Sequence, residues 1–328
     1  MQLKRRPHLI AVILIFTIIL LTIAGIAVGS VRITVSDIIK AIFRPQDISA
    51  NTAYIIRNLR IPRVLSSIVI GSALALCGLI FQCVFRNPMA DSYVLGISSG
   101  ASFFVGLGFV VGISFADVSL PVVAFIGSML TTALLFAISR RNTNSLLLTG
   151  ISLNFLLSAL TTLTIYLSDK RAESILFWTL GSLGNSNWIR LLILSCVLIT
   201  AFVIAYSNCS SMDLLLLDDS TALSSGLDVK RKRILLLSIA SVVTATVVCF
   251  SGIIGFVGLM SPHFIRILVG PKHRRLIPLS MMMGSVILLF SDMICRFIVP
   301  PSELPIGIVT SILGAPVFML LLRRKRRG

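Results

Sequence analysis

Charged residues are scarce in this chain: only 12% of its 328 residues are Asp, Glu, Lys or Arg. Soluble domains carry about twice that fraction, so the scarcity excludes an ordinary soluble domain. Hydrophobic residues make up 56% of the chain, and its mean hydropathy is +1.01. The composition therefore predicts a protein that crosses a membrane several times.

Residues typical of catalysis and metal binding are also few. The chain has three histidines, no HExxH motif, no phosphate loop of the form GxxxxGK[ST], and no Gly-Lys pair. Its six cysteines form no CxxC pair, and we expect most of them to be small buried residues. The sequence therefore predicts a protein that is not an enzyme, does not itself bind ATP through a phosphate loop, and holds no cofactor or metal.

The net charge of +17 raises the question of a nucleic-acid partner. The basic residues, however, lie in short runs between apolar stretches and form no single stripe, which argues against nucleic acid. Short basic runs of this kind are typical of the cytoplasmic loops of inner-membrane proteins.

Apolar runs near the length of about 20 residues that one helical span requires recur along the chain. They cover residues 9–31, 64–85, 92–116, 118–139, 142–168, 191–212, 234–262, 276–291 and 304–322. The seventh run is too long for one span, and we divide it into a full span over about 234–251 and a shorter helix over about 254–269. We therefore predict an all-α protein, a single domain over residues 1–328 with about ten transmembrane helices.

An even number of spans places both termini on one side of the membrane. With the termini in the cytoplasm, 19 of the 29 basic residues lie on the cytoplasmic side, as the positive-inside rule requires. Residues 32–62 and 169–188 then form extracytoplasmic connections. Within residues 32–62 we predict a short surface helix over Val35–Phe43, with Thr34 as its N-cap.

The stretch Ser251–Gly270, SGIIGFVGLMSPHFIRILVG, carries groups that lipid-facing helices avoid. Its glycines remove packing surface, Pro262 lacks an N–H, and Arg266 is costly at membrane depth. Such a segment is retained where helices pack closely, line a path or meet a partner. We expect the glycines to serve close helix packing and His263 to be a structural residue.

Two arginine motifs lie on the predicted outer side. In the motif RIPR, Pro62 can open a helix at its first turn, so that Arg60 and Arg63 stand at the outer mouth. They fit either snorkelling at the membrane interface or docking of an acidic partner. Arg296 lies on the same side and follows Asp292 by four residues, a spacing that favours an ion pair.

The segment 213–233 lies on the predicted cytoplasmic side and reads DLLLLDDSTALSSGLDVKRKR. We expect two short amphipathic helices, broken near Gly226, along the membrane face. They either pack on their own protein or dock a cytoplasmic subunit.

Four blocks of the sequence resemble the FecCD family of ABC-transporter permeases, the membrane subunits of iron–siderophore, haem and cobalamin importers. The blocks are LRIPR at 59–63, GSALALCGLIFQCVFRNPMADSYVLGISSGA at 71–101, SGIIGFVGLMSPHFIRILVGPKHRRLIP at 251–278, and SDMICRFIVPPSELPIGIVTSILGAPVFMLLL at 291–322. The blocks are long and follow in order, and the similarity runs over nearly the whole chain.

The resemblance implies an assembly in the bacterial cytoplasmic membrane. It consists of a homodimer or paired permeases, two cytoplasmic ATPase subunits, and an extracytoplasmic solute-binding protein that delivers an iron chelate. Within this chain, the resemblance assigns binding-protein docking to Arg60, Arg63 and Arg296. It assigns ATPase coupling to Asp218, Asp219, Ala222 and Gly226, and a cytoplasmic gate, by position only, to Asn142, Thr143, Asn144 and Ser145. The helix that starts near Asn142 and the last helix would line the path.

The function that the resemblance implies is ATP-driven import of an iron(III)–siderophore-type chelate, with haem or cobalamin as alternative cargo. A secondary transporter with its own ion coupling is a different alternative, and it predicts carboxylates in the middle of spans. The acidic residues of this chain lie in predicted loops or near predicted helix ends, which favours the import permease.

Overall fold

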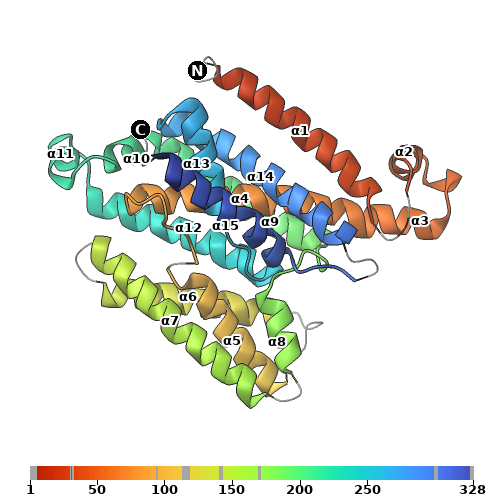
Figure 1. Ribbon diagram of the computed structural model, residues 1–328, viewed down its shortest axis with the longest axis horizontal. Coiled ribbons are helices and arrows are strands. Elements are labelled where there is room, and N and C mark those ends of the chain that lie inside the picture. Colours follow the sequence, from red (N-terminus) through yellow and green to blue (C-terminus); the bar gives the residue numbers. More distant parts are fainter. Residues whose placement is uncertain are drawn as a thin grey trace.

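The computed structural model describes residues 6–29, 31, 33–93, 95–112, 119–139, 143–168, 171–298 and 302–325. In these ranges the protein is helical, with no strand (Figure 1). The longer helices are α1 (Pro7–Ala27), α4 (Ile61–Val84), α5 (Ile97–Val111), α6 (Ser119–Ile138), α7 (Thr143–Leu167), α9 (Trp188–Ser207), α12 (Val229–Ser251), α13 (Val257–Val269), α14 (His273–Ile298) and α15 (Ile306–Lys325). The shorter ones are α2 (Val35–Phe43), α3 (Ala50–Tyr54), α8 (Ala172–Thr179), α10 (Cys209–Leu215) and α11 (Asp219–Ser224), with a 3-10 turn at Pro45–Asp47 and a π turn at Ile55–Arg60.

Each of the ten predicted helices corresponds to one long helix of the structure. Seven helices of the described chain are long and apolar enough to span a membrane. Three further apolar helices are shorter, namely Ile97–Val111, Val257–Val269 and Ile306–Val317. The all-α prediction is confirmed, whereas the count of ten spans stays a prediction, because seven helices of the described residues meet both the length and the hydropathy of a full span.

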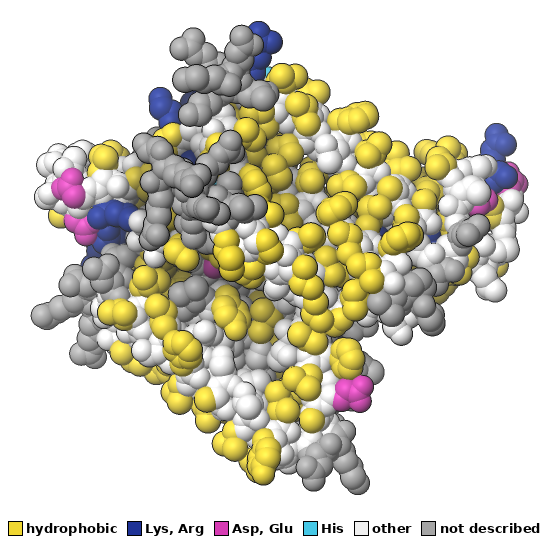
Figure 2. Space-filling model, in the orientation of Figure 1, with side chains coloured by type: hydrophobic (Ala, Val, Ile, Leu, Met, Phe, Trp, Pro, Cys, Tyr) yellow, Lys and Arg dark blue, Asp and Glu magenta, His cyan; other side chains and the backbone are white. Residues whose placement is uncertain are grey.

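Helix α4 occupies the centre of the bundle. In the most apolar part of the run Ala50–Val84, 78% of the residues are buried, against 17% in the corresponding part of Ser145–Leu167. Helices α9, α12, α13 and α14 pack around α4, while α5, α6, α7 and α8 form a second layer on one flank of α12 (Figure 1). The outward faces of α1, α7 and α9 carry exposed large hydrophobic side chains, and hydrophobic side chains cover much of the face in Figure 2. This pattern is that of helices that face lipid.

Two glycine pairs bring α4 into backbone contact with its neighbours. A Cβ placed on Gly78 would lie 2.6 Å from the Cα of Gly258 in α13. A Cβ on Gly71 would lie 2.7 Å from the carbonyl carbon of Gly284 in α14. Small residues at such crossings are how helices approach closely in a membrane. The glycine prediction is therefore confirmed at Gly258.

A polar contact accompanies the crossing of α4 and α13. Pro262 has no N–H, so it cannot bond to the carbonyl of Gly258 four residues earlier. The side-chain amide of Gln82 in α4 donates to this carbonyl at 3.3 Å and to that of Leu259 at 3.4 Å. The Gln82 carbonyl oxygen in turn accepts a bond from Arg266 at 3.3 Å. Helix α4 thus supplies the hydrogen bond that the proline removes from α13.

The two ends of the bundle differ in character. Helices α10 and α11 lie at one end, here called the α11 end, where α1 begins and α15 finishes (Figure 1). Helices α2, α3 and α8 lie at the opposite end, here called the α2 end. Helix α2 has the predicted bounds, and its N-cap Thr34 forms a capping box with Asp37, in which each side chain accepts from the other residue's N–H.

One local prediction is confirmed and another was wrong. Pro62 lies in the first turn of α4, as predicted, although the helical run already begins at Ala50 and passes through a π turn at Ile55–Arg60 before the proline. The wider turn before the proline accommodates its missing N–H. The chain does break at Gly226, but the helix that follows is the start of the long α12 and not a second short helix.

Candidate partner-binding sites at the two ends of the bundle

Three arginines from distant parts of the chain meet at the α2 end. Arg60 closes the π turn before α4, Arg63 lies in the first turn of α4, and Arg296 lies in the last turn of α14. With Glu303 they line a cavity of about 380 Å³. The sequence-based grouping of these three arginines on one side of the bundle is therefore borne out by their positions, while their docking role stays a prediction.

Arg60 and Arg296 point into the protein, where they bind carbonyls at the end of α1 and in the residues that follow it. Each side chain donates two or more bonds of 2.5–3.0 Å. The acceptors are the carbonyl oxygens of Ile26, Ala27 and Val31 for Arg60, and of Gly25 and Val28 for Arg296. Cations at a helix C-terminus satisfy carbonyls that have no partner within the helix and complement its dipole. The two residues are only 7% and 8% exposed.

Arg63 joins a buried carboxylate to an exposed one. Its guanidinium lies 2.8 Å from Asp292, which is 1% exposed, and 2.8 Å from Glu303, which is 43% exposed. Asp292 also pairs with Arg296 at 2.8 Å, which confirms the predicted pair four residues apart. Three arginines therefore face two carboxylates, and the excess positive charge favours an acidic partner. Within this cluster, the ion pair between Arg63 and Glu303 is the one that a partner's carboxylate can replace, because Glu303 is exposed to water.

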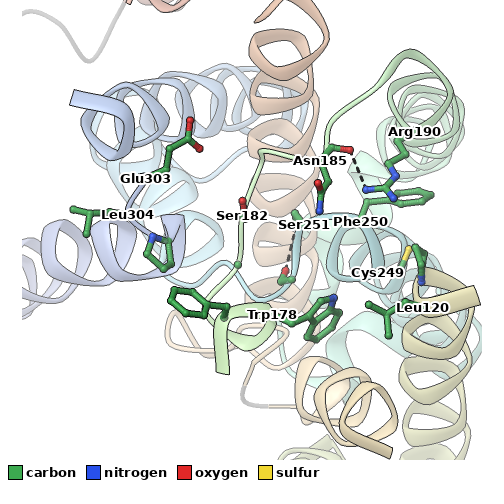
Figure 3. Close-up of a pocket in the computed structure, with 15 residues that line it drawn as sticks. Leu120, Trp178, Ser182, Asn185, Arg190, Cys249, Phe250, Ser251, Glu303 and Leu304 are labelled. Carbon is green, nitrogen blue, oxygen red and sulfur yellow. Dashed lines mark hydrogen bonds between the residues drawn. The ribbon is translucent and has the colours of Figure 1, made fainter. Parts of the chain in front are cut away.

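A second pocket of about 300 Å³ adjoins Glu303 and is lined by α6, α8, the end of α12 and the connection before α15 (Figure 3). Arg190 lies at its upper edge, 5.7 Å from the ring centre of Phe250, and donates to the carbonyl of Asn185 at 2.9 Å. Trp178 and Leu120 form its apolar floor in the view of Figure 3. The α2 end thus presents a hollowed face with charged residues at its rim.

At the opposite end, the residues that the resemblance assigns to coupling build helix α11. Asp218 is its N-cap and accepts from the N–H of Thr221 at 3.0 Å. Gly226 has φ of +82° and ends the helix in a Schellman motif, in which its N–H binds the carbonyl of Leu223 and the next N–H binds that of Ala222. The Ala222 side chain is fully buried in the core.

Asp219 holds α11 against two other helices. Its carboxylate lies 2.5 Å from Arg86, which follows α4, and 2.7 Å from Arg233, in the first turn of α12. The bonds from Arg233 first, and then those from Arg86, lower the pKa of Asp219. The pKa of Asp218 is also lowered, mainly by bonds from Ser220 and Thr221. Both carboxylates are therefore ionised at neutral pH.

A model of the FecCD transport family matches residues 15–324 of the chain. The chain belongs to the FecCD transport family. It is 35% identical to the hemin transport system permease protein HmuU of Yersinia pestis over 98% of this chain and 97% of that one. It is 35% identical to the Fe(3+) dicitrate transport system permease protein FecD of Escherichia coli, over 83% and 86% of the two chains. A solved structure described as an inward-facing conformation of a putative metal-chelate type ABC transporter matches with a TM-score of 0.84 and 30% identity, over 96% of this chain and 98% of that one.

The gate positions of this FecCD chain lie at the start of α7. Asn142 lies outside the described residues, and Thr143 and Asn144 are the first residues of the helix. Ser145 is exposed and accepts a bond from the hydroxyl of Ser139, at the end of α6, at 3.2 Å. The assignment of these four residues to a gate stays a prediction.

Sequence reasoning missed the partners of the charged residues in this FecCD chain. Glu303, Arg86 and Arg233 were assigned no contact, although each pairs with a residue that was singled out. The pairs Arg86–Asp219 and Arg63–Glu303 join residues that are 133 and 240 positions apart, and such separations carry no periodic signal in the sequence. Among the described residues, no group of three or more His, Cys, Asp or Glu side chains is placed to hold a metal ion.

Proposed function

We propose that this chain is the membrane-spanning permease subunit of an ATP-driven importer, and that it translocates an iron(III)–siderophore-type chelate delivered by a solute-binding protein. The observation that carries the proposal is the match to the FecCD transport family over residues 15–324. The names of the relatives, which include hemin and Fe(3+) dicitrate permeases, support a metal chelate as the cargo. The sequence has no phosphate loop, so ATP hydrolysis belongs to a separate subunit.

In this proposal the α11 end faces the cytoplasm and the α2 end faces outward, in a bacterial cytoplasmic membrane. The ten apolar helices all span the bilayer, and both termini are cytoplasmic. The distribution of Lys and Arg in the sequence supports this orientation, since the predicted topology places 19 of the 29 on the cytoplasmic side. Two copies of the chain form the transport unit, with α7 and α15 along the path between them. The segment 142–145 forms the cytoplasmic gate.

The outward partner is a solute-binding protein with acidic residues on its docking face. Among the three arginines, Arg63 is the residue that such a partner engages, because its bond to the exposed Glu303 is open to exchange. Arg60 and Arg296 do not contact the partner in this proposal. Both hold the end of α1 in place, and Arg296 also fixes the position of Asp292, which pairs with Arg63. The chain therefore offers one contact residue and two positioning residues.

The cytoplasmic partner is an ATPase that receives α11. The helix presents Leu223, which is 59% exposed, and the preceding turn presents Leu217, which is 44% exposed. Exposed leucines on a short projecting helix fit an apolar groove of a partner. Two such ATPases, one for each copy of the chain, complete the assembly.

A transport assay with purified components tests the proposal. Proteoliposomes that contain this chain, its cognate ATPase and its binding protein are expected to take up chelate with ATP and not with a non-hydrolysable analogue. Omission of either partner is expected to abolish uptake. Uptake by the chain alone, driven by a proton or sodium gradient, would refute the proposal in favour of a secondary transporter. Titration of the binding protein with ferric hydroxamate, ferric citrate, haemin and cobalamin identifies the cargo.

A further inference from the structure

The Asp219 carboxylate is occupied within the chain. Arg233 binds it in a bidentate manner, with its two terminal nitrogens 2.9 and 2.7 Å from the two oxygens, and Arg86 binds one of the same oxygens at 2.5 Å. Paired arginine–carboxylate contacts of this geometry are stronger than single ion pairs. Three of the roughly four lone-pair positions of this carboxylate accept bonds from within the chain, so little of its bonding capacity is left for a partner, which argues against a docking role for Asp219.

Arg86 is a fixed connection between helix ends. Its Nε donates to the carbonyl of Leu215 at the end of α10, while its terminal nitrogen reaches Asp219 at the start of α11. Its backbone φ is +49°, a left-handed conformation that is unfavourable for a residue with a Cβ. The two side-chain hydrogen bonds of Arg86 attach α10 and α11 to the end of α4.

Arg233 anchors the same carboxylate to α12. Its side chain is only 14% exposed, and its Nε is buried without a hydrogen-bond partner. Loss of the Asp219 charge would therefore leave a largely buried guanidinium without its counterion, which favours a rearrangement at this point. The contact joins the start of α11 to the start of α12 as well as to the end of α4.

We propose that the Arg86–Asp219–Arg233 cluster is a brace that transmits movement of α11 to α4 and α12, and that Asp219 is a positioning residue and not an ATPase contact. This inference rests on the proposed function. A displacement of α11 by a partner would reach α4 through Arg86, although the two helices are far apart in sequence. Because α4 meets α13 and α14 through glycine backbone contacts, it has little room to move independently of them.

The brace and the proposed docking residue lie near opposite ends of α11. Ala222 faces the core, Asp219 at the start of the helix contacts Arg86 and Arg233, and Leu223 near its end is exposed. Asp219→Asn keeps the shape of the side chain but removes its charge, whereas Leu223→Ser leaves the contacts of Asp219 in place. The two variants thus separate transmission from assembly.

The test uses the complete transporter in proteoliposomes, with the cargo identified by binding-protein titration as the uptake probe. We expect Asp219→Asn to retain the ATPase at wild-type stoichiometry but to lower uptake per ATP hydrolysed at least about fivefold, the lower range of typical coupling effects. Arg86→Gln should lower uptake per ATP in the same direction, and the double variant should lose no more than Asp219→Asn alone, because Asp219→Asn already removes the ion pair with Arg86. Asp228→Asn is the matched control, since this carboxylate caps α12 and, among the residues that the structure describes, forms its ion pair with Arg231 of the same helix.

Unchanged uptake per ATP in Asp219→Asn would overturn the brace. Loss of ATPase binding in this variant would also overturn it, because Asp219 would then belong to the docking surface. Losses from Asp219→Asn and Arg86→Gln that simply add in the double variant would equally contradict a shared contact. Leu223→Ser tests the proposed function separately: it is expected to weaken ATPase assembly, and intact assembly would disprove the placement of the ATPase at α11 whatever Asp219 does.

Discussion

Replacement of Gly78 by alanine tests whether backbone contact between α4 and α13 determines the packing of the bundle. The added Cβ would lie 2.5 and 2.6 Å from the carbonyl carbon and Cα of Gly258. Carbon atoms in contact are separated by about 3.5–4.0 Å, so the helices would have to move apart by about 1 Å. Gln82 would then lose its bonds to the Gly258 and Leu259 carbonyls, which at 3.3 and 3.4 Å are already long.

The expected cost follows from these contacts. Overpacking of this kind costs about 1–3 kcal/mol, and two lost hydrogen bonds add about 0.5–1.5 kcal/mol each. The higher helix propensity of alanine returns about 1 kcal/mol. Gly78→Ala should therefore lower the free energy of unfolding by about 1–5 kcal/mol. Gly255→Ala is the matched control, because a Cβ at Gly255 meets nothing within 4 Å.

The assay is thermal unfolding in detergent with a thiol-reactive dye, which suits a chain in which five of the six cysteines are buried. We expect the apparent melting temperature of Gly78→Ala to fall by several degrees, with Gly255→Ala within about 0.5 kcal/mol of the unmodified chain. Equal melting temperatures for the two variants would refute the reasoning, since close contact would then not limit the approach of α4 and α13.

Three further outcomes are expected. Arg60→Ala should destabilise the protein by about 1.5–3 kcal/mol, because the end of α1 loses one of its two charged hydrogen-bond donors and keeps Arg296; thermal unfolding should show a smaller loss for Arg63→Ala than for Arg60→Ala. Glu303→Gln should tighten the docking of an acidic binding protein by up to about fivefold, since an exposed ion pair worth up to ~1 kcal/mol no longer competes for Arg63; weaker docking in surface plasmon resonance would contradict this. The stability difference between the unmodified chain and Asp219→Asn should be constant from pH 8 to 5 in denaturant titrations. Because the folded-state pKa of Asp219 is lowered, the stabilisation is present above its usual pKa of 3.8 and is lost only as pH falls further, so a loss near pH 6 would contradict the pairing.

Much of the fold could be predicted from the sequence because the relevant signals are local. Apolar runs located all ten long helices, and the sequence Thr34-Val-Ser-Asp37 located α2 and its cap. The break after Ser251 was predictable because the apolar run was too long for one span. Backbone features that depend on neighbours were not predictable: the π turn before Pro62 and the continuation through it arise from the packing of the run Ala50–Val84 in the bundle.

The candidate sites were predictable only in part, for a related physical reason. Residue type identified arginine as suited to carboxylates, and this holds for Arg63. The sequence did not reveal that Arg60 and Arg296 turn inward to the end of α1, because backbone carbonyls are acceptors that every residue carries. Nor did it reveal that Asp219 is paired within the chain, since its partners come from two other helices.

The contact of Gln82 with α13 bears on how the protein enters its membrane. Helix α13 has 13 residues, about 20 Å in length, whereas the hydrocarbon core is about 30 Å thick. It also contains Pro262 and Arg266, and its freed carbonyl and its arginine both bind Gln82. A nascent segment with these properties partitions poorly into lipid by itself. During biogenesis α13 should therefore leave the translocon only when α4 is already in place to receive it, so that its insertion is a step of tertiary folding.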